Sequence, residues 1–155
     1  MHSRRMSPPI CIAPSLNLPV GIEELRAEAT GEGFRFVDKL VAEWLSGTNR
    51  FSRPGEVFLV AFRATDLVAF GGLNRDPYTD ESGVGRLRHL YIRKSNRRSG
   101  LGSALVQELL DHAESTFHLV RLRTATREAA DFYVRLKFHV VQDETATHVK
   151  SLRQS

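Results

Sequence analysis

Apolar residues recur at helical spacing in two segments near the start of the chain. In the first segment, Ile22, Leu25 and Ala29 fall on one face, and two glutamates lie near the amino end, where the helix dipole favours them. In the second, an apolar stripe predicts a helix from about Phe34 to Leu45. The first third of the chain is therefore expected to supply two amphipathic helices.

Strand patterns surround these helices. Residues 1–9 are polar and contain prolines, which indicates a flexible N-terminal arm, and a short first strand is expected at 10–13. Two long apolar runs, Glu56–Arg63 and Asp66–Arg75, are separated by a two-residue link. This arrangement is typical of a β-hairpin.

A third long strand is predicted over Gly85–Arg93, and its apolar phase slips by one residue. Leu90 and Ile92 alternate as strand residues do, so the same face should carry an apolar residue at position 88. Position 88 is an arginine, and the apolar residue is Leu87. One extra residue in a strand has this effect, so we expect a β-bulge here.

The second half of the chain alternates helices and strands. The patterns predict an amphipathic helix over 105–117, a strand over 118–126, a helix over 127–138 and two closing strand segments over 139–152. A strand, a helix and a second strand in this order form a βαβ unit with parallel strands. We expect one α/β (α+β) domain over 10–155, with a mixed, mostly antiparallel sheet, a central parallel βαβ unit and flanking helices.

Length and composition limit the functional classes. The chain has 155 residues, 41% of them hydrophobic and 26% charged, which suits a single globular domain. It has neither an apolar run of about 18 residues nor a secretory signal, so we expect no membrane partner and a cytoplasmic location. Its one cysteine, Cys11, cannot form an internal disulfide and is expected to be buried as an apolar residue.

The positive charge of the chain is locally concentrated. The net charge of +4 favours an anionic partner, and Arg93, Lys94, Arg97 and Arg98 lie together directly before a helix. No long basic stripe with interleaved aromatic residues accompanies them, so we expect no nucleic-acid partner. A compact anion is favoured instead.

Two glycines follow these basic residues between a strand and a helix. Gly100 and Gly102 lack the Cβ atoms that would keep a phosphate from the unpaired N–H groups of a helix amino end, so the loop suits a pyrophosphate. It lacks the Gly-Lys-Ser/Thr ending of a Walker A loop, and Leu105 stands where a dinucleotide fingerprint has its third glycine. The competing interpretation is a tight turn with solvated arginines.

The pattern Arg97-x-x-Gly100-x-Gly102, preceded by LYIR, resembles the acyl-coenzyme A motif of the GNAT acetyltransferase superfamily. The segment AADFYVRLKF resembles the helix that follows the motif in that family, and the similarity extends over Glu56–Val141. The resemblance implies a GNAT-like fold with acetyl-CoA (coenzyme A) as cofactor. It also implies transfer of an acetyl group to a primary amine of a small molecule or peptide.

The resemblance also implies roles for individual residues. Tyr133 occupies the position of a general acid for the leaving thiolate, and the backbone N–H of Leu90 would meet the developing oxyanion. The competing interpretation of Tyr133 is a core aromatic residue. The bulge would separate the strand from its parallel neighbour and admit pantetheine. The expected cofactor-binding residues are Leu90, Tyr91, Ile92, Arg97, Arg98, Ser99, Gly100, Leu101, Gly102 and Ser103.

The general base is not identified by the sequence. Arg86 stands where many relatives have a glutamate, and an arginine cannot accept a proton from an ammonium. His89 is one candidate base, although a lone histidine in a strand is more often structural. Asp80 and Glu81, in the turn before the third strand, are candidates for attracting a cationic amine, although a solvated turn is the simpler interpretation.

Several further points stay open. Lys137 replaces the glycine that relatives carry after the Tyr133 helix, which puts the tightness of that turn in doubt. Thr124 and Thr126 are weaker candidates for contact with the cofactor or the acceptor. A module that binds coenzyme A without catalysis is the alternative function, favoured by Arg86 and opposed by Tyr133. Peptide amines, polyamines, antibiotics and amino acids all remain candidate acceptors, and a homodimer through the closing strands is compatible with the sequence.

Overall fold

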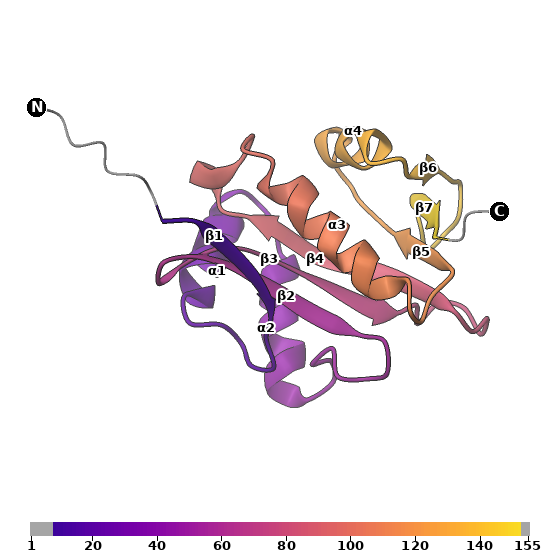
Figure 1. Ribbon diagram of the computed structural model, residues 1–155, viewed down its shortest axis with the longest axis horizontal. Helices are drawn as coiled ribbons and strands as arrows, with labels where there is room; N and C mark the ends of the chain where they lie inside the picture. Colours follow the sequence, from indigo (N-terminus) through magenta and orange to yellow (C-terminus); the bar gives the residue numbers. More distant parts are fainter. Residues whose placement is uncertain (1–7, 153–155) are drawn as a thin grey trace, which may run out of the picture.

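The computed structural model describes residues 8–152, which form one seven-stranded sheet with helices on both faces (Figure 1). The strands lie in the order β1-β2-β3-β4-β5-β7-β6. In chain order the elements are β1 (Ile10–Pro14), α1 (Ile22–Gly31), α2 (Phe36–Ser46), β2 (Val57–Arg63), β3 (Asp66–Arg75), β4 (Val84–Ile92), a 3₁₀ turn (Lys94–Asn96), α3 (Leu101–Ala113), β5 (Leu119–Leu122), α4 (Arg127–Arg135), β6 (His139–Val140) and β7 (His148–Ser151).

The sheet has the mixed topology that the sequence predicts. Neighbouring strands are antiparallel except β4 and β5, which are parallel and are connected through α3. Because two parallel strands need a crossover, α3 covers the sheet directly over β2, β3 and β4. This confirms the expected βαβ unit and the fold class.

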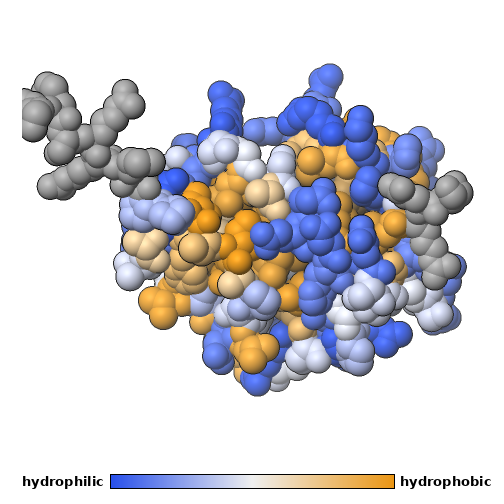
Figure 2. Space-filling model, in the orientation of Figure 1, coloured by the Kyte–Doolittle hydropathy of each residue, from blue (hydrophilic) through white to orange (hydrophobic). Residues whose placement is uncertain are grey.

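Two apolar cores lie on opposite faces of the sheet. On one face, α3 and α4 pack through residues such as Leu105, Leu109 and Tyr133. On the other face, α1 and α2 pack through a cluster that includes Trp44 and Phe58. Figure 2 shows the face of α3, where hydrophilic side chains run along the helix and apolar atoms are visible on either side of it.

The predicted bulge is present in β4. Phe70 of β3 pairs with Tyr91 of β4, and the next paired residue, Gly72, faces Arg88. Two residues of β4, His89 and Leu90, therefore lie opposite one residue of β3. His89 adopts the left-handed conformation, with φ +61°. Its ring packs with aromatic residues on the α1/α2 face, whereas Leu90 packs into the core under α3.

The parallel strands separate at the same level. Pairing between β4 and β5 covers only Val84–Arg86 of β4 and Leu119–Arg121 of β5. From Leu87 to Ile92, β4 has no strand partner on the side of β5 among the described residues. The fold therefore leaves one backbone edge of β4 free beside α4.

Helix α1 fixes the turn that follows β4. The guanidinium of Arg97 donates two hydrogen bonds of 2.6 Å to the carboxylate of Glu32, and these bonds lower the pKa of Glu32 to about 2. The Tyr91 hydroxyl lies 2.7 Å from carboxylate oxygens of both Glu28 and Glu32. The backbone N–H of Lys94 also donates to Glu28 at 2.7 Å. These contacts hold the loop rigidly against α1.

Three local expectations need correction. The second helix begins at Phe36 instead of Phe34. The strand expected over 118–126 ends at Leu122, since Thr126 adopts the N-cap position of α4 and its side chain accepts the N–H of Ala129. Cys11 is exposed, because β1 is an edge strand and this residue faces away from the core.

Two other expectations concern the ends of elements and of the chain. Lys137 adopts a left-handed φ of +73°, so the turn after α4 is formed without the glycine that relatives carry. The proposed N-terminal arm lies mostly outside the described residues, which begin at residue 8. No helix within residues 8–152 is long and apolar enough to cross a membrane.

Replacement of Gly72 should destabilise the fold. A Cβ atom at Gly72 would overlap the buried ring of Phe51. We therefore expect Gly72→Ala to lower the free energy of unfolding by about 1–3 kcal/mol, measured by urea denaturation. Gly31→Ala is the matched control, since a Cβ there meets no atom within 4 Å, and it should cause no loss. Equal stability of the two variants would contradict this packing.

The Glu32→Gln variant should lose stability in a pH-dependent way. Arg97 and Tyr91 lose their charged partner, so we expect the free energy of unfolding at pH 7 to fall by about 1–3 kcal/mol. The folded pKa of Glu32 is about 2, below its unfolded value. The difference from the wild type should therefore be complete above about pH 5 and decline as the pH falls from about 4.5 towards 2.

Chemical denaturation across this pH range measures the effect. Glu23→Gln is the control, because Glu23 lies on the same helix with an exposed side chain. A Glu32→Gln variant as stable as the control at pH 7 would show that α1 does not hold the loop through this pair.

Candidate active site

A cavity of about 740 Å³ lies beside the free edge of β4. Its wall consists of the glycine loop, the second half of β4, the chain that follows β5, and α4. It continues towards the α1/α2 face, where Phe34 and Phe36 contribute to the wall. The separation of β4 from β5 thus coincides with a cavity that joins both faces of the sheet.

Most of the expected site residues line this cavity. Ser99 and Leu101 are the two that do not: the Ser99 hydroxyl donates to the carbonyl of Asn96, and Leu101 is buried in the core. The expected residues in the wall are Leu90, Tyr91, Ile92, Arg97, Arg98, Gly100, Gly102, Ser103 and Tyr133.

The loop presents a run of unpaired backbone donors. The N–H groups from Arg98 to Ser103 donate no hydrogen bond to any other residue in the described part of the chain. Gly100 is the N-cap of α3 with φ +85°, and no side chain caps the helix. Successive free N–H groups at a helix amino end attract an anion, because the helix dipole adds to their partial charges.

The two arginines of the loop differ in their surroundings. The Arg97 guanidinium is held by Glu32 and also donates to the carbonyl of Ile92 at 3.0 Å. Arg98 is exposed, and its side chain makes no hydrogen bond or ion pair with a described residue. Arg97 therefore fixes the loop, and Arg98 is the side chain that remains free to meet a phosphate.

The surroundings of Tyr133 are compatible with both of its interpretations, a core aromatic residue and a general acid. The side chain is 7% exposed and packs edge-on against Phe132 and Phe138, with ring centroids 5.0 and 5.3 Å apart. The residue also lines the cavity, and its hydroxyl makes no hydrogen bond with a described residue. Burial raises the pKa of Tyr133 above its usual value, so the hydroxyl stays protonated and can donate.

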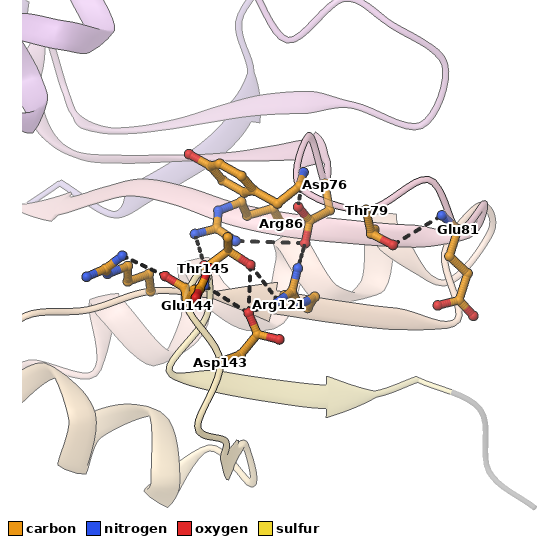
Figure 3. A network of polar contacts seen from close by, with 10 residues as sticks. Asp76, Thr79, Glu81, Arg86, Arg121, Asp143, Glu144 and Thr145 are labelled. Carbon is orange, nitrogen blue, oxygen red and sulfur yellow. Dashed lines mark hydrogen bonds and ion pairs between the residues drawn. The ribbon is translucent and has the colours of Figure 1, made fainter.

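Arg86 is a buried cation with few partners. Its Nη2 donates to the Thr145 carbonyl at 2.6 Å, and its Nη1 lies 3.8 Å from Asp76 without a hydrogen bond. Asp76 lies closer to Arg121, at 2.7 Å, and Arg121 also pairs with Asp143 at 3.1 Å, so the two arginines meet two carboxylates (Figure 3). Burial lowers the pKa of Arg86, and the adjacent Asp76 opposes this effect.

The candidate base His89 is unsuited to that role. Burial, together with the smaller effects of the Arg88 and Lys39 charges, lowers its pKa to about 3. Its ring stacks on Phe36 at 6.2 Å between centroids. An imidazole with this pKa does not take a proton from an ammonium at neutral pH.

Of the four weaker candidates from the sequence, two line the cavity and two do not. Thr124 and Thr126 line the cavity, whereas Asp80 and Glu81 do not. Glu81 instead lines a separate cavity of about 650 Å³, together with Arg121 and Thr145. The sequence analysis did not assign site roles to the lining residues Phe34, Phe36, Lys39, Tyr78, Arg88, Arg123, Glu128 and Arg135, and of these only Arg135 lies in one of the motif segments that resemble the family.

Comparison with known proteins agrees with this geometry. The family model for the acetyltransferase (GNAT) family matches residues 21–138. Among curated proteins, none matches the chain. A presumed acetyltransferase from Exiguobacterium sp. 255-15 superposes with a TM-score of 0.82 and 26% identity, over 92% of this chain and 93% of that one.

Two more distant structures share the fold. The GNAT family N-acetyltransferase YhbS from Escherichia coli, in complex with CoA, has a TM-score of 0.67 and 15% identity, over 99% of this chain and 86% of that one. Arabidopsis thaliana NAA60, in complex with a bisubstrate analogue, has a TM-score of 0.66 and 16% identity, over 91% of this chain and 94% of that one. With a family model that spans most of its length and the characteristic divided sheet, this chain belongs to the GNAT acetyltransferase family.

Proposed function

We propose that the protein transfers the acetyl group of acetyl-CoA to a primary amine. The observation that carries this proposal is the run of unpaired N–H groups from Arg98 to Ser103, at one end of a cavity that also contains Tyr133. An anion site and a protonated hydroxyl in one cavity suit a substrate with a diphosphate and a reactive thioester. The CoA complex of the related Escherichia coli protein supports the same choice of cofactor.

The loop fits the diphosphate of coenzyme A. The free N–H groups would bind its oxygens, and the exposed Arg98 would add a charged donor. A Cβ at Gly100 would meet no atom within 4 Å, so space beside the loop is open for a ligand. Ser99 and Leu101 would contribute only backbone N–H groups, since their side chains lie outside the cavity wall.

The free edge of β4 fits the pantetheine arm. From Leu90 to Ile92 this edge lacks a neighbouring strand and lines the cavity. An extended chain with amide groups would pair with it as an added strand does. The thioester would then lie close to the bulge, on the path from the loop towards the α1/α2 face.

The chemistry requires charge stabilisation and one proton donor. Acetyl-CoA supplies an activated thioester as the second substrate. The N–H of Leu90, at the bulge, would stabilise negative charge on the carbonyl oxygen, and Tyr133 would donate its proton to the departing sulfur. Neither Arg86 nor His89 is a suitable base at neutral pH, so the amine would enter neutral and release its proton to water.

A second candidate function is a CoA-binding sensor without catalysis. The observation that favours it is Arg86, a cation where relatives carry a glutamate, together with the low pKa of His89. A sensor would bind acetyl-CoA but release no thiol with any amine. An enzyme would release thiol in an amine-dependent manner, so an acceptor panel with free-thiol detection distinguishes them.

Tyr133→Phe should separate chemistry from binding. If Tyr133 is the general acid, kcat should fall on the order of 100-fold, while the Kd for acetyl-CoA from calorimetry stays the same. Because burial raises the pKa of Tyr133, the wild-type kcat should not decline up to about pH 9.5. A variant with unchanged kcat would mean that Tyr133 is a core aromatic residue only.

Gly100→Ala should weaken cofactor binding specifically. Alanine at φ +85° is strained by about 1 kcal/mol, and relief of the strain would turn the loop N–H groups away from the diphosphate. Gly47→Ala is the matched control, with φ +80° at the end of α2. Both variants should lose similar stability, and only Gly100→Ala should raise the Kd for acetyl-CoA, by about threefold or more. Equal Kd values in both variants would refute the role of the loop.

A further inference from the structure

The α1/α2 end of the cavity is aromatic and cationic, and this bears on the amine acceptor if the proposed function holds. Phe34, Phe36 and Tyr78 provide its aromatic wall. Lys39 of α2 and Arg88 of β4 provide positive charge beside it. Among the cavity-lining residues, the one carboxylate is that of Glu128, which lies at the start of α4.

Arg88 has unused hydrogen-bond donors in this wall. Its side chain is 18% exposed, and its nearest charged partner is Glu43, at 3.9 Å. The guanidinium donates no hydrogen bond to any residue from 8 to 152, and the facing Glu43 Oε1 is also without one. The guanidinium is partly exposed in the cavity wall, so its donors are available to a ligand that displaces water.

Lys39 adds a second positive charge to the one that Arg88 provides at this end of the cavity. Lys39 is exposed at the rim and forms no ion pair with a described residue. Arg86 also lies within the wall, but Asp76 and Asp143 together balance the charges of Arg86 and Arg121. Burial is the main cause of the low pKa of His89, and the nearby charges of Arg88 and Lys39 contribute to it.

We propose that the acceptor is a small amine that also carries a carboxylate, of the class of free α-amino acids with an apolar side chain. Arg88 binds the carboxylate through its free donors, and Lys39 adds charge at the rim. Phe34 and Phe36 contact the apolar side chain. The cations disfavour polyamines, whose second ammonium would meet no carboxylate here.

The charges of Arg88 and Lys39 also affect how a bound amine would lose its proton without a general base. A bound ammonium beside Arg88 and Lys39 loses its proton more readily than in water, because nearby positive charge disfavours the charged form. The carboxylate of the acceptor balances the charge of Arg88, and Lys39, which forms no ion pair with a described residue, leaves a positive charge beside the amine. Arginine in place of the usual glutamate is then compatible with transfer to an amine, since the acceptor becomes neutral without a side-chain base.

A panel of paired acceptors tests this proposal. Free apolar amino acids are compared with their amides and with the corresponding decarboxylated amines, by thiol release from acetyl-CoA. We expect at least one free amino acid to have a kcat/KM about tenfold or more above that of its amide. Similar or higher values for all the amides, or acetylation of polyamines alone, would overturn the proposal.

Variants connect the preference to the named side chains. Arg88→Gln and Lys39→Gln should each reduce the ratio of kcat/KM for the free amino acid to kcat/KM for its amide. Arg88→Lys should retain most of this ratio, and Arg75→Gln, which changes an exposed residue, should leave it unchanged. Because Arg88→Gln leaves Glu43 unpaired, Lys39→Gln, which changes an exposed residue, keeps the test independent of folding. If neither Arg88→Gln nor Lys39→Gln altered the preference for free amino acids over amides, the assignment of carboxylate binding to these side chains would be refuted.

A measurement of acetyl-CoA binding distinguishes failure of the acceptor assignment from failure of the proposed function. If calorimetry shows acetyl-CoA bound to the wild type, and amides or polyamines are the acceptors, the acceptor assignment fails while the proposed function stands. If acetyl-CoA binds and no amine in the panel is acetylated, the acceptor assignment also fails and the sensor function is favoured. If acetyl-CoA does not bind, the proposed function itself fails.

Discussion

The extra residue in β4 is the constraint on which the rest of the structure depends. Because His89 and Leu90 lie opposite one residue of β3, β4 turns away from β5 after Arg86, and its edge stays unpaired. The cavity occupies this separation, and the loop after β4 reaches one end of it. The left-handed backbone of His89 is stabilised by aromatic packing on the α1/α2 face, so the core supports the local strain.

The arginines at the two ends of this cavity differ in how they are paired. At the loop, Glu32 neutralises Arg97, so the side chain of the motif arginine holds the turn while the backbone N–H groups from Arg98 to Ser103 stay without a partner among the described residues. At the opposite end, Arg88 has only a loose ion pair, and Arg86 shares its carboxylate with Arg121. The motif arginine is thus fully paired, whereas the Arg88 guanidinium donates no hydrogen bond to a described residue.

Local patterns in the sequence were sufficient for the sheet, the bulge and the loop. The bulge was visible because Leu87 and Leu90 are out of phase, and the loop because two glycines follow a strand. The partner of Arg97 was not predictable, since Glu32 is 65 residues away and its pattern is that of any helix face. The same holds for Lys39 and Arg88, which meet at the cavity only through the packing of α2 on the sheet.

The position of β7 has a consequence for the order of folding. This strand lies between β5 and β6, so β5 gains its second neighbour from residues 148–151. Tyr133 packs against His148 of the same strand, at 6.2 Å between ring centroids. During synthesis the wall around the Tyr133 ring therefore stays incomplete until these residues leave the ribosome, although the hairpin and α3 can assemble earlier from contacts close in sequence.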